Sequence, residues 1–372
     1  MSDKIWLSPP HLSGEELKYI KDAFDKNWIS PYGDNIDSFE SKLEAYFEVP
    51  DVALVNSGTS AIHLSLILAG IGPGDEVIVP TLNFAGCVNP ILYQKAIPLF
   101  IDSESDTWNI DPMIAEEVII SKIKSGKKPK AIIAVHLFGM PCKIEAILAL
   151  GTKYNIPVIE DAADALGSTV NGKKTGAFGL SGIISFNGNK TITTSGGGVL
   201  ISKDPEIIRQ AKHLSNQART LKPYYVHDAV GYNYMMSNIL AGLGTAQMEV
   251  LEQRIAKRRE IYSIYKSELS RQSNIFFPEE PEGSHSNRWL TSILLDNEKS
   301  RDHLYHSLAE NNIESRPVWN PMHRQPAFSS FPFYGAETAQ QLFEKGLCLP
   351  SGSSMTEEQL ERIIACIKKY MQ

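Results

Sequence analysis

The sequence predicts an α/β fold: a mostly parallel β-sheet between layers of helices, followed by a smaller C-terminal α+β unit. From residue 52 to residue 200, short apolar runs alternate with helical stretches, which is the rhythm of strand–helix–strand units. Each run is unbroken in apolar character, as in strands that are buried on both faces. At 372 residues the chain is long enough for two domains, and we expect a large domain over residues 1–245 and a small one over residues 246–372.

The elements follow in order along the chain. Two amphipathic helices come first, with apolar positions at Leu17, Ile20 and Phe24 in one and at Phe39, Leu43 and Phe47 in the other. The predicted strands of the sheet are residues 52–55, 76–79, 97–101, 131–135, 157–159, 182–186 and 199–202. Helices over residues 60–69 and 144–154 lie between them. The later elements are one long helix over residues 240–265, a strand over 289–295, a helix over 301–311 and a terminal helix over 356–371.

Composition excludes several classes of protein. The net charge is −7 and the sequence contains no cluster of Lys and Arg residues, which argues against a nucleic-acid partner. The four cysteines never form a CxxC pair, so we expect neither a disulfide framework nor a metal site. Neither a signal-peptide core nor a membrane-spanning stretch is evident, so we expect a cytoplasmic protein with no membrane partner.

Two residues indicate a specific chemistry. Lys190 lies in a turn rich in Asn and Gly, just after a predicted strand. Alone, it would be read as a solvated turn residue. Upstream, Asp161 ends another predicted strand, in an acidic segment that also contains Asp164. A lysine that forms a Schiff base and an aspartate that pairs with a pyridinium nitrogen are the groups that pyridoxal phosphate (PLP) requires from a protein.

Four further segments are compatible with a PLP site, and each has a simpler explanation. Residues 57–60 turn from a strand into a helix whose free N–H groups could bind a phosphate, although simple N-capping is the alternative. Phe84 could stack on a pyridine ring or belong to the core, and His136 could be a hydrogen-bonded core residue. Asn233 lies in a polar patch before the long helix. All but the last follow strand ends, where open α/β sheets bind ligands.

These pieces resemble the DegT-type sugar aminotransferases, which are PLP-dependent enzymes of fold type I. The matching segments are residues 56–59, 80–84, 159–163, 185–190, 231–234 and 315–319. The similarity extends over residues 5–367, and the motifs around Asp161 and Lys190 are its most specific part. The resemblance implies an aspartate-aminotransferase-like fold, with a large PLP-binding domain and a small C-terminal domain.

The resemblance also implies roles for individual residues. Lys190 would bind the cofactor covalently and, as a free amine, move a proton between the substrate carbon and C4′. Asp161 would keep the pyridine nitrogen protonated, and Phe84 would stack on the ring. The residues expected to bind the phosphate are Gly58, Thr59 and Ser185. Asn233 would reach the phosphate of the neighbouring subunit, which implies a homodimer with shared active sites.

Three positions depart from the family pattern. Asp164 stands near the cofactor where relatives more often have His, Gln or Glu, and its side chain has a short reach. Met235 and Asn320 replace an Arg and a Lys that are common in relatives, in regions that resemble the nucleotide-sugar pocket. The cation that pairs with the substrate diphosphate therefore stays open among Arg316, Arg219 and Lys222, with arginine the better fit for a bidentate contact.

Within the family, the resemblance favours enzymes that act on UDP-4-keto-6-deoxy-N-acetylglucosamine. It implies transfer of an amino group from L-glutamate to C4 of that sugar. The candidate sugar-side residues are Trp28, Ser30, Asn187, Arg316 and His323. The alternatives are a C3 or C4 aminotransferase for a dTDP- or GDP-linked keto sugar, a PLP-dependent sugar dehydratase, and a non-catalytic regulator with this fold. Lys190 argues against the dehydratases, which typically have His at this position.

Overall fold

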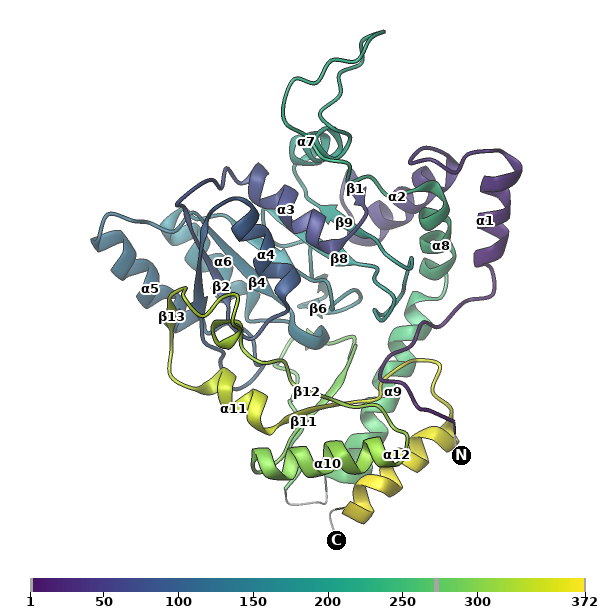
Figure 1. The fold of residues 1–372 in the computed structure, drawn as a ribbon, viewed down its shortest axis with the longest axis vertical. Coiled ribbons are helices and arrows are strands. Elements are labelled where there is room, and N and C mark those ends of the chain that lie inside the picture. Colours follow the sequence, from purple (N-terminus) through teal and green to yellow (C-terminus); the bar gives the residue numbers. More distant parts are fainter. Residues whose placement is uncertain (1–2, 271–273, 371–372) are drawn as a thin grey trace.

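A computed structural model describes residues 3–270 and 274–370, and an eight-stranded sheet forms its centre (Figure 1). In spatial order the strands are β1 (Val52–Val55), β9 (Gly198–Ile201), β8 (Ser181–Ser185), β5 (Val158–Asp161), β4 (Ala131–Val135), β2 (Glu76–Pro80), β3 (Ile97–Ile101) and β13 (Phe333–Tyr334). Seven of them run in the same direction, and β9 runs opposite to these. The predicted, mostly parallel sheet is confirmed.

Helices cover both faces of this sheet. They are α3 (Gly58–Leu68), α4 (Ala85–Tyr93), α5 (Pro112–Lys124), α6 (Ile144–Tyr154) and α7 (Pro205–Ser215). Along β2, Val77 and Val79 pack with α3, α4 and α7, whereas Ile78 packs with α5 and α6. Because side chains alternate between the faces of a strand, two separate cores form and the strands are apolar throughout. The result is the predicted three-layer arrangement.

A smaller antiparallel sheet organises the C-terminal part. Its elements are β11 (Thr291–Leu294), β14 (Gly346–Leu349), β12 (Arg316–Pro317), α9 (Leu251–Leu269), α10 (Glu298–Glu310), α11 (Thr338–Lys345) and α12 (Glu357–Tyr370). Side chains of α9, α10, α12, β11 and β14 share one apolar core. The predicted terminal helix is present, and its last predicted residue, Met371, lies outside the described residues.

The chain passes between the two parts more than once. Near the N-terminus, Ile5 donates its N–H to the carbonyl of Asn312 at 3.0 Å and accepts the Glu314 N–H at 2.8 Å. In the other direction, β13 returns from the C-terminal part to pair with β3. These contacts join residues on either side of the predicted boundary between residues 245 and 246. That domain boundary therefore stays a prediction.

The single long helix predicted over residues 240–265 is wrong. The structure contains two helices instead, α8 (Asn238–Met248) and α9. Between them, the N–H groups of Glu249 and Val250 bond to carbonyls three residues back, at 3.3 Å each. This tighter hydrogen bonding interrupts the α-helical ladder for one step, which the uniform helical spacing of the sequence does not reveal.

The two N-terminal helices differ in burial. In α2 (Asp34–Phe47), the predicted apolar positions are buried against α8. In α1 (Glu16–Asp25), Glu16 and Ala23 face inward, while Leu17 is 76% exposed and Phe24 is 59% exposed. An apolar helix face that this chain leaves uncovered is a candidate for contact with another molecule.

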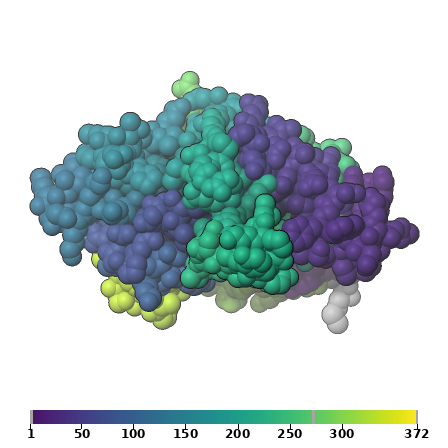
Figure 2. Space-filling view, turned by 90° about the horizontal axis from the view of Figure 1, so that it is seen from above, coloured from purple at the N-terminus to yellow at the C-terminus, as the bar shows by residue number. Residues whose placement is uncertain are grey.

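Residues 216–233 form a hairpin that projects from the large sheet beyond α7 (Figure 1), tied by bridges between Asn216 and Asn233 and between Arg219 and His227. Seen from above, it stands beside the N-terminal helices (Figure 2), and the amide of Asn216 donates to the hydroxyl of Tyr32 at 3.0 Å. The remaining short elements are β6 (Thr169–Val170), β7 (Lys173–Lys174), β10 (Ser284–His285), η1 (Leu137–Gly139) and η2 (Met322–Arg324). Among the described helices, none has the length and apolarity that crossing a membrane requires.

Candidate active site

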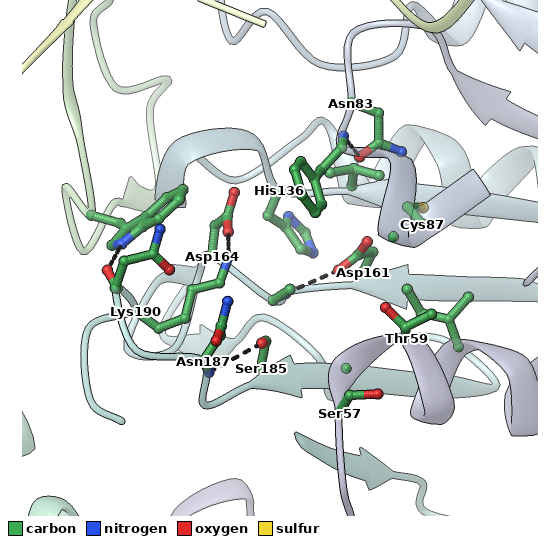
Figure 3. A pocket seen from close by; sticks show the side chains of 18 of the residues that line it. Ser57, Thr59, Asn83, Cys87, His136, Asp161, Asp164, Ser185, Asn187 and Lys190 are labelled. Carbon is green, nitrogen blue, oxygen red and sulfur yellow. Dashed lines mark hydrogen bonds and ion pairs between the residues drawn. The ribbon is translucent and has the colours of Figure 1, made fainter. Parts of the chain in front are cut away.

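A cavity of about 300 Å³ lies where the parallel strands end (Figure 3), at the small end of the size range of ligand sites. Most of its lining residues come from the ends of β1, β2, β4, β5 and β8, the turns after them and the start of α3 and α4. Gly196 and Gly197 before β9, and Trp289 and Trp319 of the C-terminal part, complete the lining. Seven of the predicted site residues are in this lining: Gly58, Thr59, Phe84, Asp161, Asp164, Ser185 and Lys190. Asn187, predicted for the sugar side, also lines it. The expectation that strand ends bring these motifs together is confirmed.

Lys190 extends into this cavity from the turn after β8. The turn is closed by a hydrogen bond from the Lys190 N–H to the carbonyl of Asn187 at 3.1 Å. The amine forms an ion pair with the carboxylate of Asp164, and it lies 4.2 Å from the ring centroid of Trp289 (Figure 3). The amine is therefore held by a carboxylate and an aromatic ring in a site that is largely closed to solvent.

Asp161 ends β5 and is only 6% exposed. Burial raises the pKa of Asp161, the Ala163 N–H opposes that rise with a hydrogen bond of 3.1 Å, the negative charge of Asp164 adds to it and the Lys190 amine opposes it. Because an opposite charge favours the ionised form of a buried carboxyl group, a protonated pyridine nitrogen beside Asp161 would lower that pKa again. Asp161 is thus a buried acid whose ionised form a cationic ligand would stabilise.

The start of α3 shows the N-capping that was one of the two readings of this segment. Ser57 is the N-cap, and its hydroxyl accepts the Ser60 N–H at 3.0 Å. The N–H groups of Gly58 and Thr59 have no hydrogen-bond acceptor among the described residues, as is usual in the first turn of a helix. A Cβ atom on Gly58 would lie 3.1 Å from the Cβ of Ser185, so glycine lets the two segments approach closely. The cap leaves these two N–H groups free, and their binding of a phosphate stays a prediction.

Phe84 is 62% exposed and lines the cavity, so the alternative reading as a core residue is wrong. Its ring centroid is 5.5 Å from that of Trp319. A Cβ atom on Gly86 would lie 3.0 Å from Thr59 Oγ1 and 3.3 Å from the Phe84 ring, so a side chain there would crowd the cavity. Asn83 also lines the cavity, and its buried Nδ2 has no partner among the described residues.

These groups fit PLP. An amine, a buried carboxylate, free N–H groups at a helix start and an exposed ring line one cavity, and they correspond to the aldehyde, pyridine nitrogen, phosphate and ring face of the cofactor. The Nδ2 atom of Asn83 adds a donor with no hydrogen-bond partner among the described residues, while the Oδ1 atom accepts the Phe84 N–H at 2.7 Å. Asn83 lies within the matching segment of residues 80–84, but no role was predicted for its side chain.

A second hollow, of about 680 Å³, adjoins this cavity and shares four of its lining residues: Phe84, Asn189, Trp289 and Trp319. We call it the groove. Its other lining residues are Trp6, Leu7, Ser8, Pro9, Pro10, Leu290, Glu314, Arg316, Pro317 and Cys348. Among the predicted sugar-side residues, Arg316 lies here, with its guanidinium 2.9 Å from Glu314. No sequence pattern marks residues 6–10 as part of a site, because their contacts are to distant segments.

Other predicted substrate residues line neither hollow. The carbonyls of Trp28 and Ser30 accept hydrogen bonds from Asn238 at 2.8 and 2.9 Å. His323 accepts or donates a bond to Thr81 Oγ1 at 2.6 Å and stacks on Phe333. Their substrate contacts stay predictions.

The remaining predicted residues lie on the hairpin or in the core. Asn233 is exposed at the base of the hairpin and outside its own cavity lining, and Arg219 and Lys222 are exposed on the hairpin itself. His136 is fully buried: its Nδ1 accepts the Cys142 N–H at 3.1 Å and its Nε2 lies 3.2 Å from Glu160. His136 is thus a hydrogen-bonded core residue that also forms part of the cavity wall.

Known proteins match nearly the whole chain. The sequence pattern of the DegT/DnrJ/EryC1/StrS aminotransferase family matches residues 10–368. The chain is 48% identical over 368 residues, 98% of its length and 95% of the relative's, to EpsN of Bacillus subtilis, whose name describes a pyridoxal phosphate-dependent aminotransferase. It is 38% identical to the GDP-perosamine synthase of Escherichia coli O157:H7, over 97% of both chains.

A solved structure agrees with these matches. Spr1654 of Streptococcus pneumoniae, a sugar aminotransferase by its name, has been solved in its PLP form. It superimposes with a TM-score of 0.91 at 26% identity, over 99% of this chain and 98% of its own. The chain therefore belongs to the DegT/DnrJ/EryC1/StrS family and is a PLP-dependent sugar aminotransferase of fold type I.

Proposed function

We propose that the enzyme transfers an amino group from L-glutamate to C4 of UDP-4-keto-6-deoxy-N-acetylglucosamine in the cytoplasm. The observation that carries the proposal is the junction of the cavity and the groove. The Lys190 amine lies in the small cavity, which opens through shared residues into a groove of more than twice its volume. The keto carbon of a substrate could lie in the cavity, within reach of the Lys190 amine that would move the proton, while a larger group attached to that carbon occupies the groove.

Each of the predicted cavity residues has its own role in this proposal. PLP, when bound, supplies an electron sink next to the substrate amine. Lys190 Nζ would hold the cofactor and, as a free amine, would carry a proton to and from the reacting carbon; the carboxylate of Asp164 contacts that amine. Asp161 would keep the pyridine nitrogen protonated. Gly58, Thr59 and Ser185 would bind the phosphate, and Phe84 would cover the ring.

Arg316 is our candidate for the substrate diphosphate. It is the predicted cation that lines the groove, and an arginine fork matches phosphate oxygens. We expect Arg316→Gln to raise KM for the nucleotide sugar by about 10- to 100-fold, because a charge-assisted hydrogen bond is lost. The half-reaction with L-glutamate should keep its rate, since glutamate has no diphosphate.

Arg209→Gln is the matched control. Arg209 is similarly exposed and also pairs with a glutamate, Glu206, but it lies on α7 outside both hollows. Steady-state kinetics with varied sugar and single-turnover kinetics with glutamate separate the two half-reactions. An unchanged KM in Arg316→Gln would leave Arg219 and Lys222 as the candidates.

A GDP-linked sugar is the second candidate, and one finding favours it. The relative at 38% identity is named GDP-perosamine synthase. Supplying the purified enzyme with UDP-, GDP- and dTDP-linked 4-keto-6-deoxy sugars, and comparing kcat/KM for each, decides between them. A preference of at least about 10-fold for the UDP sugar supports our proposal, and the same preference for the GDP or dTDP sugar overturns it.

We also propose a homodimer with shared active sites. The hairpin exposes Leu221, Tyr224, Tyr225 and Val230, and α1 nearby exposes Leu17 and Phe24. Large apolar side chains left uncovered by one chain are typical of a surface that a partner covers. Asn233, at the base of that hairpin, would then contact the phosphate in the second subunit.

Mixing two inactive variants tests this arrangement. We expect Lys190→Ala and Asn233→Ala each to be much less active alone, and a refolded equimolar mixture to recover up to about a quarter of wild-type activity. Half of the dimers are then mixed, and each mixed dimer has one site with both Lys190 and Asn233. Light scattering gives the oligomeric state. Failure of the mixture to recover activity, although mixed dimers form, would place Asn233 outside the neighbour's site.

A further inference from the structure

Arg258 on α9 is an arginine with an unusual environment. It is 1% exposed, and among the described residues no carboxylate forms an ion pair with it. Burial, and after it the charge of Arg254, lower the pKa of Arg258 to about 9, so the side chain is still a cation at neutral pH. Burying a charge without a counter-ion costs free energy. The hydrogen bonds between the guanidinium and the surrounding chain must therefore offset this cost.

The guanidinium binds four uncharged acceptors from four distant segments. Nη1 donates to the carbonyls of Trp289 at 2.7 Å and Ser351 at 3.0 Å. Nη2 donates to Ser8 Oγ at 3.1 Å and, at the long limit of 3.5 Å, to the carbonyl of Lys190. The Nε atom has no partner among the described residues. Two of these acceptors, Trp289 and Lys190, belong to residues whose side chains meet in the cavity.

A second layer of bonds reinforces the hold on the Lys190 turn. The carbonyl of Asn189 accepts the Ser8 hydroxyl at 2.8 Å and the indole N–H of Trp289 at 2.7 Å. Both of those donors belong to residues that Arg258 itself binds. The Asn189–Lys190 peptide is therefore held mainly by the hydrogen bonds from Ser8 and Trp289. The long bond from Arg258 to the Lys190 carbonyl contributes only weakly.

We propose that Arg258 is a positioning residue of the aminotransferase reaction: it holds the Ser8 hydroxyl and the main chain of Trp289, whose side chains bind the Asn189 carbonyl, and thereby places the Lys190 amine for reaction. It acts mainly through Ser8 and Trp289 and lines neither of the two hollows itself. The proposal deepens the proposed function, in which Lys190 carries the proton.

Arg258→Met, which is similar in length but uncharged, and Arg258→Lys, which keeps the charge but loses the fork, test it. Arg301→Met is the matched control: Arg301 is also buried, on α10, and it binds the carbonyl of Phe343 and the carboxylates of Asp302 and Glu298. The primary readouts are the visible circular dichroism of the bound cofactor and the rate of covalent PLP attachment to the cofactor-free protein.

We expect Arg258→Met to lose at least half of the cofactor's circular dichroism, and attachment and kcat to slow by about 10-fold or more, with Arg258→Lys intermediate. KM for L-glutamate should stay within about threefold, because Arg258 does not line the site. Arg301→Met should lower the melting temperature but leave the dichroism and attachment rate unchanged. If both methionine variants lose only stability, Arg258 is structural and the proposal fails.

Ser8→Ala covers the case in which Arg258→Met does not fold. It removes the hydroxyl between Arg258 and Asn189 without leaving a carboxylate unpaired. We expect a smaller change of the same kind, in attachment rate and dichroism, and a wild-type response here would overturn the proposal. Should wild-type protein bind PLP but not respond to L-glutamate, the proposed amino donor fails, while these cofactor readouts still test Arg258.

Discussion

Lys190→Ala is expected to lower turnover by more than about 10⁴-fold, because both the covalent bond to the cofactor and the group that moves the proton are lost. The protein should still bind PLP through the other cavity residues, but without the visible absorption band of a lysine-bound cofactor. Absorption spectra before and after L-glutamate, followed by product analysis with the keto sugar, measure both effects.

The control for this variant is Lys143→Ala. Lys143 is partly exposed and paired with Glu104 and Asp106, away from the cavity, so its loss should leave spectrum and turnover unchanged. Turnover by Lys190→Ala at a rate near that of the wild type would be incompatible with the mechanism proposed for Lys190. Bound cofactor in the wild type that ignores L-glutamate would instead point to another amino donor or to dehydration.

Asp161→Asn is expected to lower kcat by about 10²- to 10⁴-fold, because a neutral amide cannot hold the pyridine nitrogen protonated and the electron sink weakens. The amide has the shape of the carboxyl group, so the cavity should keep its form. Steady-state and single-turnover kinetics with L-glutamate measure the loss. A variant with wild-type kcat would show that Asp161 does not contact the cofactor nitrogen.

The same variant should have an opposite effect on the cofactor-free protein. Burial raises the pKa of Asp161 above its value in the unfolded chain. Between those two values the folded state binds the extra proton, so the free energy of unfolding falls as the pH rises through that window. Asparagine removes this penalty, and we expect cofactor-free Asp161→Asn to unfold at the same temperature as the wild type, or higher, at neutral pH. Thermal unfolding followed by circular dichroism checks it.

Local sequence patterns predicted most of the fold. The strands β1, β3 and β4 and the helix α6 have the predicted bounds, because continuous apolar runs and helical spacing are local signals. The two errors have different causes. The break between α8 and α9 depends on local hydrogen bonds of Glu249 and Val250 that uniform helical spacing does not reveal, whereas the exposed face of α1 depends on what surrounds that helix.

The sequence likewise predicted the part of the site that short motifs encode. Lys190 and Asp161 were identified because few reactions need that pair of groups, and strand ends placed them at one edge of the sheet. Trp289 and Trp319 were missed because a tryptophan in the C-terminal part carries no local mark of a cavity. Both come to the cavity only because the C-terminal sheet packs over the strand ends.

The sequence by itself determined the fold class, the cofactor chemistry and the family, because each is encoded in short segments whose spacing or side-chain chemistry is distinctive. Only the tertiary structure decided what surrounds the reactive lysine. The ion pair with Asp164, the contact with Trp289, the groove lined by residues 6–10 and the support from Arg258 join segments up to hundreds of residues apart. Such contacts depend on how the packed layers align, and no local pattern specifies that alignment.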